Sequence, residues 1–135
     1  MASKFLLEIV TPHRKFYEKS VDRIVVRGME GEMAVLRDHT PLVTPLAIGK
    51  IIIINDEQEE EATLAGGFMQ ISEEKVVIVT ESAEWPQEID LERAKAARQR
   101  AEERLNSGKE VDQDRADEAL RKANVRIDMA EKYGK

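Results

Sequence analysis

Hydrophobic and polar positions in the first two thirds of the chain follow a short-period pattern. Runs of apolar and β-branched residues alternate with turn residues every eight to twelve positions, which is typical of an all-β sandwich or barrel. The predicted strands are Phe5–Val10, Lys15–Tyr17, Ser20–Arg27, Glu32–Leu36, Leu42–Leu46, Lys50–Asn55, Glu61–Leu64, Phe68–Ile71 and Lys75–Glu81.

Glycine and proline mark the expected ends of these strands. Glycine adopts the positive φ of tight turns, and proline cannot donate a hydrogen bond to a central ladder, so both residues favour strand ends. The expected ends lie at Pro12, Gly28, Gly31, Pro41, Pro45, Gly49, Gly66, Gly67 and residues 72–74.

The last third of the chain has a helical period instead. Asp90 is predicted to cap a helix that runs to about Leu105, and a second helix is expected from Asp112 or Asp114 to Glu131. The connection is short, which predicts an antiparallel αα-hairpin. Apolar residues recur at helical spacing at Leu91, Ala94, Ala101, Leu105, Ala116, Ala119, Leu120, Ala123, Ile127 and Ala130.

The predicted fold class is therefore α+β in two parts. An antiparallel β-sandwich is expected over residues 1–86, followed by a helix-turn-helix hairpin over residues 87–135. Charge divides the chain at the same place: residues 1–87 carry 9 basic and 15 acidic side chains, whereas residues 88–135 carry 12 of each. The acidity of the whole chain thus belongs to the predicted sandwich.

The apolar stripes of the two helices consist mainly of alanine. Because each buried methyl-sized group contributes only about 0.8 kcal/mol, the seam between the helices is expected to open at little cost. Pairs such as Asp117 with Arg121 stabilise each helix on its own by about 0.2–0.5 kcal/mol. These numbers favour a hairpin that acts as a switch, and a permanently docked hairpin remains the alternative.

Composition excludes several classes of function. The chain has no cysteine, so disulfides, thiolate metal sites and cysteine nucleophiles are excluded, and a net charge of -6 argues against a general nucleic-acid binder. His13 and His39 are not spaced as a zinc-binding pair, and the phosphate-loop pattern fails at Gly49-Lys50 because Ile51 follows. The sequence therefore predicts no catalytic residue, no metal site and no enzymatic turnover.

No window approaches the roughly 18 consecutive apolar residues that a membrane span needs. The N-terminal residues also lack the apolar core and cleavage site of a secretory signal. We therefore expect a cytoplasmic protein whose chain does not itself cross a bilayer.

Four segments together resemble a known family. They are GEMAVLRDHTPLVTPLAIG at residues 31–49, GGFMQI at 66–71, VVIVTESA at 76–83 and IDLERA at 89–94. In this order, and with the β-then-αα layout, the chain is similar to the epsilon subunit of bacterial F-type ATP synthases.

The resemblance implies a non-catalytic part of the central rotor. It implies that the β-sandwich binds the gamma subunit and the ring of membrane c subunits, so that proton-driven rotation is coupled to ATP synthesis. It also implies a hairpin that folds on the sandwich or extends toward the catalytic alpha and beta subunits, where it inhibits ATP hydrolysis. The protein would then be peripheral, at the cytoplasmic face of the cell membrane.

The resemblance implies that no cofactor is required for the rotor function. Some members of the family, however, bind ATP on the folded hairpin as a regulatory ligand. The resemblance places ATP-binding residues at Glu84, Ile89, Asp90, Arg93, Ala94, Arg100, Lys122 and Arg126. Lys122 departs from the arginine of well-known ATP binders, and a lysine cannot form a bidentate fork with phosphate, so the affinity for ATP could be weaker or lost.

Spacing alone supports part of this set. Asp90, Arg93 and Arg100 share one face of the predicted first helix, and Lys122 and Arg126 are neighbours at i,i+4 on the second. Two like charges at that spacing repel unless an anion lies between them, and a polyphosphate is one such anion. Simple solvation on an exposed helix face is the alternative for these arginines.

Two further surfaces have predicted partners. Arg115, Arg121, Lys122 and Arg126 are expected to meet acidic segments of the catalytic subunits when the hairpin extends. His39 and the turn that contains Glu30, Gly31 and Glu32 are expected to contact gamma or the c-ring, with a backbone-satisfied histidine and an ordinary hairpin turn as the alternatives.

One rival function comes from a different class of protein. The chain could be a free-standing nucleotide or small-ligand sensor in which the sandwich binds the ligand and the hairpin reports it. Copurification with other head and stalk subunits distinguishes a rotor part from such a sensor.

Overall fold

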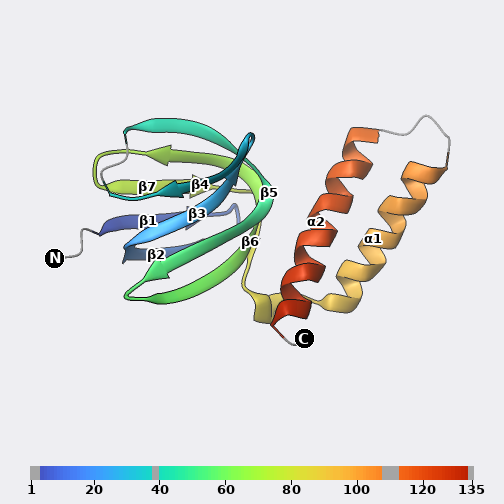
Figure 1. The fold of residues 1–135 in the computed structure, drawn as a ribbon. Coiled ribbons are helices and arrows are strands. Elements are labelled where there is room, and N and C mark those ends of the chain that lie inside the picture. Colours follow the sequence, from blue (N-terminus) through green and yellow to red (C-terminus); the bar gives the residue numbers. More distant parts are fainter. Residues whose placement is uncertain (1–3, 38–39, 108–112, 134–135) are drawn as a thin grey trace. The chain divides into compact units, whose positions relative to one another are not determined.

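A computed structural model describes residues 4–37, 40–107 and 113–133 of the chain. The chain forms two compact units, Met1–Ala83 and Glu84–Lys135. The first unit is a β-sandwich and the second is a two-helix hairpin (Figure 1). The predicted fold class is therefore confirmed.

The sandwich is built from one continuous, strongly curved sheet. Its strands follow the order β2-β1-β7-β6-β5-β3-β4, and the short β8 pairs with β6. Only the β1–β7 pairing is parallel, and the other pairings along this path are antiparallel. The strands are β1 (Phe5–Val10), β2 (Lys15–Val21), β3 (Arg23–Gly28), β4 (Gly31–Val35), β5 (Leu42–Asn55), β6 (Gln58–Ile71), β7 (Lys75–Val79) and β8 (Ala83–Glu84).

Strands β5 and β6 are each fourteen residues long, and Figure 1 shows both curving across the sandwich. The prediction of a strand end at Gly49 was wrong, because β5 continues through this residue. A Cβ on Gly49 would lie 3.2 Å from the Cβ and Cδ atoms of Arg27 on β3. Gly49 is therefore needed for close approach to the neighbouring side chain, not for a turn.

The predicted break at Gly66 and Gly67 was also wrong, because β6 continues through both residues. Both have positive φ, 81° and 109°. A Cβ on Gly67 would lie 2.0 Å from the carbonyl oxygen of Val79 on β7, so only glycine fits at this position. The two glycines bend a continuous strand.

The predicted strand Ser20–Arg27 is divided in the structure at Asp22. The Asp22 carboxylate oxygen Oδ2 accepts a hydrogen bond from the Asp56 backbone N–H at 2.8 Å. The Nζ atom of Lys4 donates to Asp56 Oδ1, also at 2.8 Å. These contacts connect the start of the chain, the β2–β3 junction and the β5–β6 turn, a long-range arrangement that no local pattern contains.

The core of the sandwich follows strand alternation. Strand β1 buries Phe5, Leu7 and Ile9, and the intervening side chains are half-buried. The other strands bury Val21, Ile24, Val26, Val35, Ile51, Ile53, Leu64, Met69, Ile71, Val76 and Ile78. Alternation does not hold throughout, because residues 61–64 of β6 are all buried.

The second unit begins with a single 3-10 turn, η1 (Pro86–Glu88), and continues as α1 (Leu91–Asn106) and α2 (Gln113–Lys132). Helix α1 begins and ends within one residue of the prediction. Its alanine stripe is buried as expected, at Ala94 and Ala101, and the stripe of α2 is buried at Ala116, Ala123, Ile127 and Ala130. The small residues expected to form the seam between the helices are therefore buried.

Candidate functional site

The linker ahead of α1 is ordered by local hydrogen bonds. The backbone N–H of Trp85 donates to Glu88 Oε1 at 2.9 Å, and the Glu88 N–H donates back to the Trp85 carbonyl at 3.0 Å. Pro86 occupies the first position of η1, where its missing N–H costs nothing, and its side chain is buried. This turn fixes the direction in which the chain enters α1.

Asp90 is the N-cap of α1, as predicted from the sequence. Its Oδ1 atom accepts a hydrogen bond from the backbone N–H of Arg93 at 3.1 Å. Such a cap satisfies one of the free N–H groups of the first turn and stabilises a helix by about 1 kcal/mol. Ala94 follows on the buried side of α1, whereas the Arg93 side chain is exposed.

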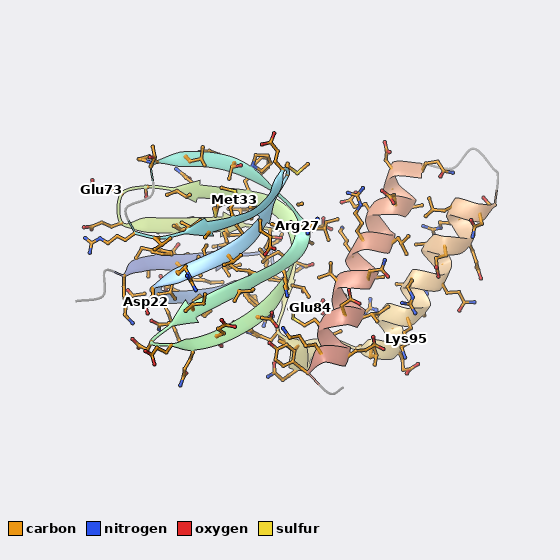
Figure 2. The ribbon with its side chains drawn as sticks, in the orientation of Figure 1. Asp22, Arg27, Met33, Glu73, Glu84 and Lys95 are labelled. Carbon is orange, nitrogen blue, oxygen red and sulfur yellow. The ribbon has the colours of Figure 1, made fainter. Side chains whose placement is uncertain are left out.

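Arg126 on α2 lies against Glu84, the last residue of β8 and the first residue of the helical unit. The Arg126 Nε atom donates to Glu84 Oε1 at 2.5 Å, and each side chain is about 30% exposed. Figure 2 labels Glu84 at the start of the helical unit. The contact joins residues 42 positions apart, and it brings two of the predicted ATP-binding residues together.

Lys122 lies one helical turn before Arg126 on α2. Its Nζ atom is 3.6 Å from Glu118 Oε1, an ion pair at i,i+4 along the helix. The predicted neighbours Lys122 and Arg126 therefore both lie beside carboxylates of the same unit. Two of the positive charges expected to face a polyphosphate are compensated within the helical unit itself.

The other two arginines predicted to bind ATP make fewer contacts. Arg93 and Arg100 are exposed on α1, and in the part of the chain that the structure describes no ion pair or hydrogen bond engages their side chains. The structure thus joins Glu84 to Arg126, and Asp90 to the backbone of Arg93, but it does not join these two pairs to Arg100.

Sequence reasoning missed the apolar cluster at the base of the hairpin. Ile89 is buried against Met129 and Ala130 near the end of α2, and Leu91 packs at its side. Met129 falls outside the alanine stripe, so helical periodicity alone did not select it. In the structure the Ile89 side chain therefore belongs to this cluster. Its place beside a nucleotide stays a prediction.

Two basic residues predicted to meet the catalytic subunits lie on exposed positions of α2. Arg121 pairs with Asp117 at 2.8 Å, one turn earlier on the same helix. Arg115 is exposed in the first turn of the described part of α2. Neither residue belongs to the buried seam, so both are accessible from outside the helical unit.

The predicted turn between β3 and β4 is a tight hairpin. Gly28 pairs with Gly31 across a loop of Met29 and Glu30, and Gly31 has a φ of 128°. Met29 is 68% exposed, and Glu30 and Glu32 are also exposed. His39, the other residue predicted to contact gamma, lies outside the described residues.

The outer face of the sandwich carries an apolar patch that the sequence did not reveal. Phe68 on β6 pairs with Pro45 on β5 and with Val79 on β7, and Val43 lies two residues before Pro45. Phe68, Val79 and Val43 are 59%, 54% and 65% exposed. We call Val43, Pro45, Phe68 and Val79 the outer patch, and exposed apolar groups on adjacent strands are typical of an interaction surface.

Within residues 4–37, 40–107 and 113–133, no group of three or more His, Cys, Asp or Glu side chains is placed to hold a metal ion. No helix in these same ranges is long and apolar enough to cross a membrane.

Two family models match the chain and define its class of protein. The ATP synthase delta/epsilon chain beta-sandwich domain matches residues 4–86, and the delta/epsilon chain long alpha-helix domain matches residues 87–131. The two matches cover nearly the whole chain in order. The fold is thus that of a two-part ATP synthase subunit.

Individual relatives agree with this class. The ATP synthase epsilon chain of Caldanaerobacter subterraneus subsp. tengcongensis is 45% identical over 135 residues, which cover 98% of each chain. The epsilon chain of Alkaliphilus metalliredigens is 53% identical over 105 residues, or 78% of each chain.

Among solved structures, a chain in the Euglena gracilis mitochondrial ATP synthase, resolved as OSCP, F1 and c-ring, superposes with a TM-score of 0.82 at 25% identity. The match covers 95% of the present chain and 81% of the Euglena chain. The chain therefore belongs to the delta/epsilon chain family of ATP synthases, and the relatives named above are its epsilon chains. The resemblance inferred from the four sequence segments is confirmed.

Proposed function

We propose that the chain is a non-catalytic rotor subunit in the central stalk of an F-type ATP synthase, at the cytoplasmic face of the cell membrane. The observation that carries the proposal is the match of two family domains, in order, to the two structural units. The name of the Euglena structure, which includes F1 and a c-ring, supports the same assembly. In this role the subunit transmits proton-driven rotation to the catalytic head and turns over no substrate.

The sandwich would bind the gamma subunit and the c-ring. The outer patch supports a protein partner, because Phe68 and its neighbours otherwise leave large apolar groups in water. The Met29–Glu30 loop supports a second contact, because it places an exposed methionine and a carboxylate at the tip of a rigid hairpin. Gamma is the expected partner of the patch, and the c-ring is the expected partner of the loop.

The hairpin would regulate the complex by extending toward the alpha and beta subunits. Its seam is made largely of alanine methyl groups, each worth about 0.8 kcal/mol, so the helices separate at low cost. The ion pair of Arg121 with Asp117 lies within one helix and survives that separation. Arg115, Arg121, Lys122 and Arg126 would then attract acidic segments of the catalytic subunits and inhibit ATP hydrolysis.

ATP would bind the closed hairpin as a regulatory ligand. The site would consist of Glu84, Ile89, Asp90, Arg93, Ala94, Arg100, Lys122 and Arg126. Asp90 already accepts one backbone hydrogen bond through Oδ1, which leaves Oδ2 to accept from an adenine amino group. At a hundred times its dissociation constant, ATP would stabilise the closed hairpin by about 2.7 kcal/mol.

The test of rotor membership is copurification. A tagged form of the full chain, expressed in its own cells, is expected to bring gamma and the other head subunits out of detergent-solubilised membranes. Phe68→Ser should reduce the recovery of gamma, because it removes the largest apolar group of the outer patch. Recovery of the full chain without any of these subunits would contradict the proposal and favour the free-standing sensor.

The test of the ATP site is calorimetry on the purified full chain. Arg93→Ala and Arg126→Ala are each expected to weaken ATP binding by about tenfold or more, because charged hydrogen bonds to phosphate contribute about 1.5–3 kcal/mol. Arg121→Ala is the matched control, since this α2 arginine pairs with Asp117 and lies outside the proposed site. Equal affinity in the parent and all three variants would contradict the site.

A further inference from the structure

The two-residue loop at the tip of the β3–β4 hairpin carries one apolar side chain, the thioether of Met29. This side chain is 68% exposed, and its neighbour in the loop is the exposed Glu30. We propose that Met29 is a redox-sensitive contact residue. A peroxide oxidises it in preference to the other described methionines, and the resulting sulfoxide weakens the contact of the loop with the c-ring. The inference rests on the rotor function proposed above.

The other described methionines are more protected from solvent. Met69 on β6 and Met129 on α2 are 0% and 4% exposed. Met33 belongs to the same hairpin as Met29, is labelled in Figure 2, and is half-buried. Met1 lies outside the described residues. Because a thioether must be reached by the oxidant, Met29 is the most susceptible of the described methionines.

Gly28 explains how the hairpin protects the second methionine. A Cβ on Gly28 would lie 3.0 Å from the Met33 Sδ atom, so this sulfur occupies the space that the absent side chain leaves. The backbone at Gly28 therefore covers one side of the Met33 sulfur. The hairpin thus presents one thioether to water and packs the other, which provides an internal comparison for the reactivity of Met29.

The proposed modification transfers one oxygen atom to the sulfur. A lone pair of the Met29 Sδ atom attacks an oxygen of hydrogen peroxide, so that an S–O bond forms while the O–O bond breaks. The departing hydroxide takes up the remaining peroxide proton and leaves as water. The sulfur is oxidised by two electrons and the peroxide is reduced by the same two. Methionine sulfoxide reductases restore the thioether, so the change is reversible.

Oxidation changes the surface of the loop and leaves the core of the sandwich intact. Most of the Met29 side chain lies in water, so an added oxygen displaces no packed core atoms. Glu30 and Glu32 are also exposed on this hairpin, and both are charged. The sulfoxide therefore removes the apolar group that the loop offers to a partner. Loss of one buried methionine contact should weaken the binding of the chain by about tenfold.

The first measurement treats the purified full chain with hydrogen peroxide and follows each methionine by peptide mass spectrometry. Met29 is expected to react at least about tenfold faster than Met69 and Met129, and also faster than Met33. Gly28→Ala should raise the rate at Met33, because the added methyl group displaces its sulfur, and leave the rate at Met29 unchanged. The rates in the parent chain test the selectivity even if this variant unfolds.

The second measurement titrates the full chain onto membranes from cells that lack it and retain the other subunits of the complex. The oxidised parent should need about a tenfold higher concentration for half-maximal binding than the untreated parent. Met29→Leu is the matched control, because leucine is close to methionine in volume and has no sulfur. Its binding should be the same before and after treatment with peroxide.

Each result decides a different part of the proposal. Equal oxidation rates at Met29 and Met33, or at Met29 and the buried methionines, would overturn the assignment of the modification site. Unchanged binding of the oxidised parent, or an equal loss in Met29→Leu, would overturn the contact role, while binding of the untreated chain would still support the rotor function. If the untreated parent does not bind these membranes, the proposed rotor function falls, and the c-ring contact of Met29 falls with it.

Discussion

Gly67 is the position at which the structure tolerates a side chain least. It has a φ of 109°, and a Cβ added there would lie 2.0 Å from the Val79 carbonyl oxygen and 2.9 Å from the Thr80 Cα. The obstacles are backbone atoms of the neighbouring strand, which cannot rotate away. Gly67→Ala therefore has to shift β6 relative to β7 or distort the bend between them.

The expected loss of stability has two parts. The left-handed backbone conformation costs about 1–2 kcal/mol for an alanine, and forcing the methyl group against packed backbone costs about 1–3 kcal/mol more. The sum is about 2–5 kcal/mol. For a domain of this size each kcal/mol lowers the unfolding midpoint by about 4–8 °C, so Gly67→Ala should lower it by at least about 8 °C.

Scanning calorimetry of the full chain measures this shift, and two glycines provide matched controls. Gly31 has a φ of 128° with no atom within 4 Å of an added Cβ, so Gly31→Ala carries the conformational cost alone. At Gly49 the added Cβ would lie 3.2 Å from the Arg27 Cβ and Cδ atoms, a much milder contact than the one at Gly67, so Gly49→Ala should cost less than Gly67→Ala. If Gly67→Ala were no more destabilising than Gly31→Ala, the steric argument would be refuted.

Two further predictions concern the hairpin base and the surface charges. Met129→Ala should destabilise the hairpin by about 2–5 kcal/mol, because it leaves a cavity against Ile89. Thermal unfolding followed by the circular dichroism of the helices measures this loss. The control is Asp128→Ala, because Asp128 is exposed on the same helix. The hydrogen bond from Lys75 lowers the pKa of Glu8, so the sandwich should lose stability as the pH falls below about 4.5 and through that lowered pKa. Lys75→Gln should flatten this loss in urea unfolding measured at a series of acidic pH values, and an unchanged slope would contradict the assignment.

Local signals in the sequence were sufficient for the hairpin. The Asp90 cap is formed by a side chain and a backbone N–H three residues later, so one short segment contains all of the information. The alanine stripes are also local, because helical spacing places Ala94 and Ala101 on one face. For these elements the predicted and observed ends agree within one or two residues.

The bends of the sandwich and the main contact of the candidate site could not be predicted in this way. At Gly49 the space for a side chain is limited by Arg27 on another strand, and at Gly67 it is limited by the backbone of Val79. The sequence around each glycine does not contain these contacts, so both positions were predicted as strand ends. The resemblance assigned Glu84 and Arg126 separately to a nucleotide site. Their direct contact spans 42 residues, and only the fold of the helical unit brings them together.

The linker contains the only tryptophan of the chain. Trp85 is half-buried and takes part in the hydrogen bonds that order η1, immediately beside Glu84. Its indole therefore reports on the junction between the two units without any added label. A change in the environment of Trp85 would alter the intensity and wavelength of its fluorescence emission, so this emission would report the opening of the hairpin if the hairpin opens as proposed.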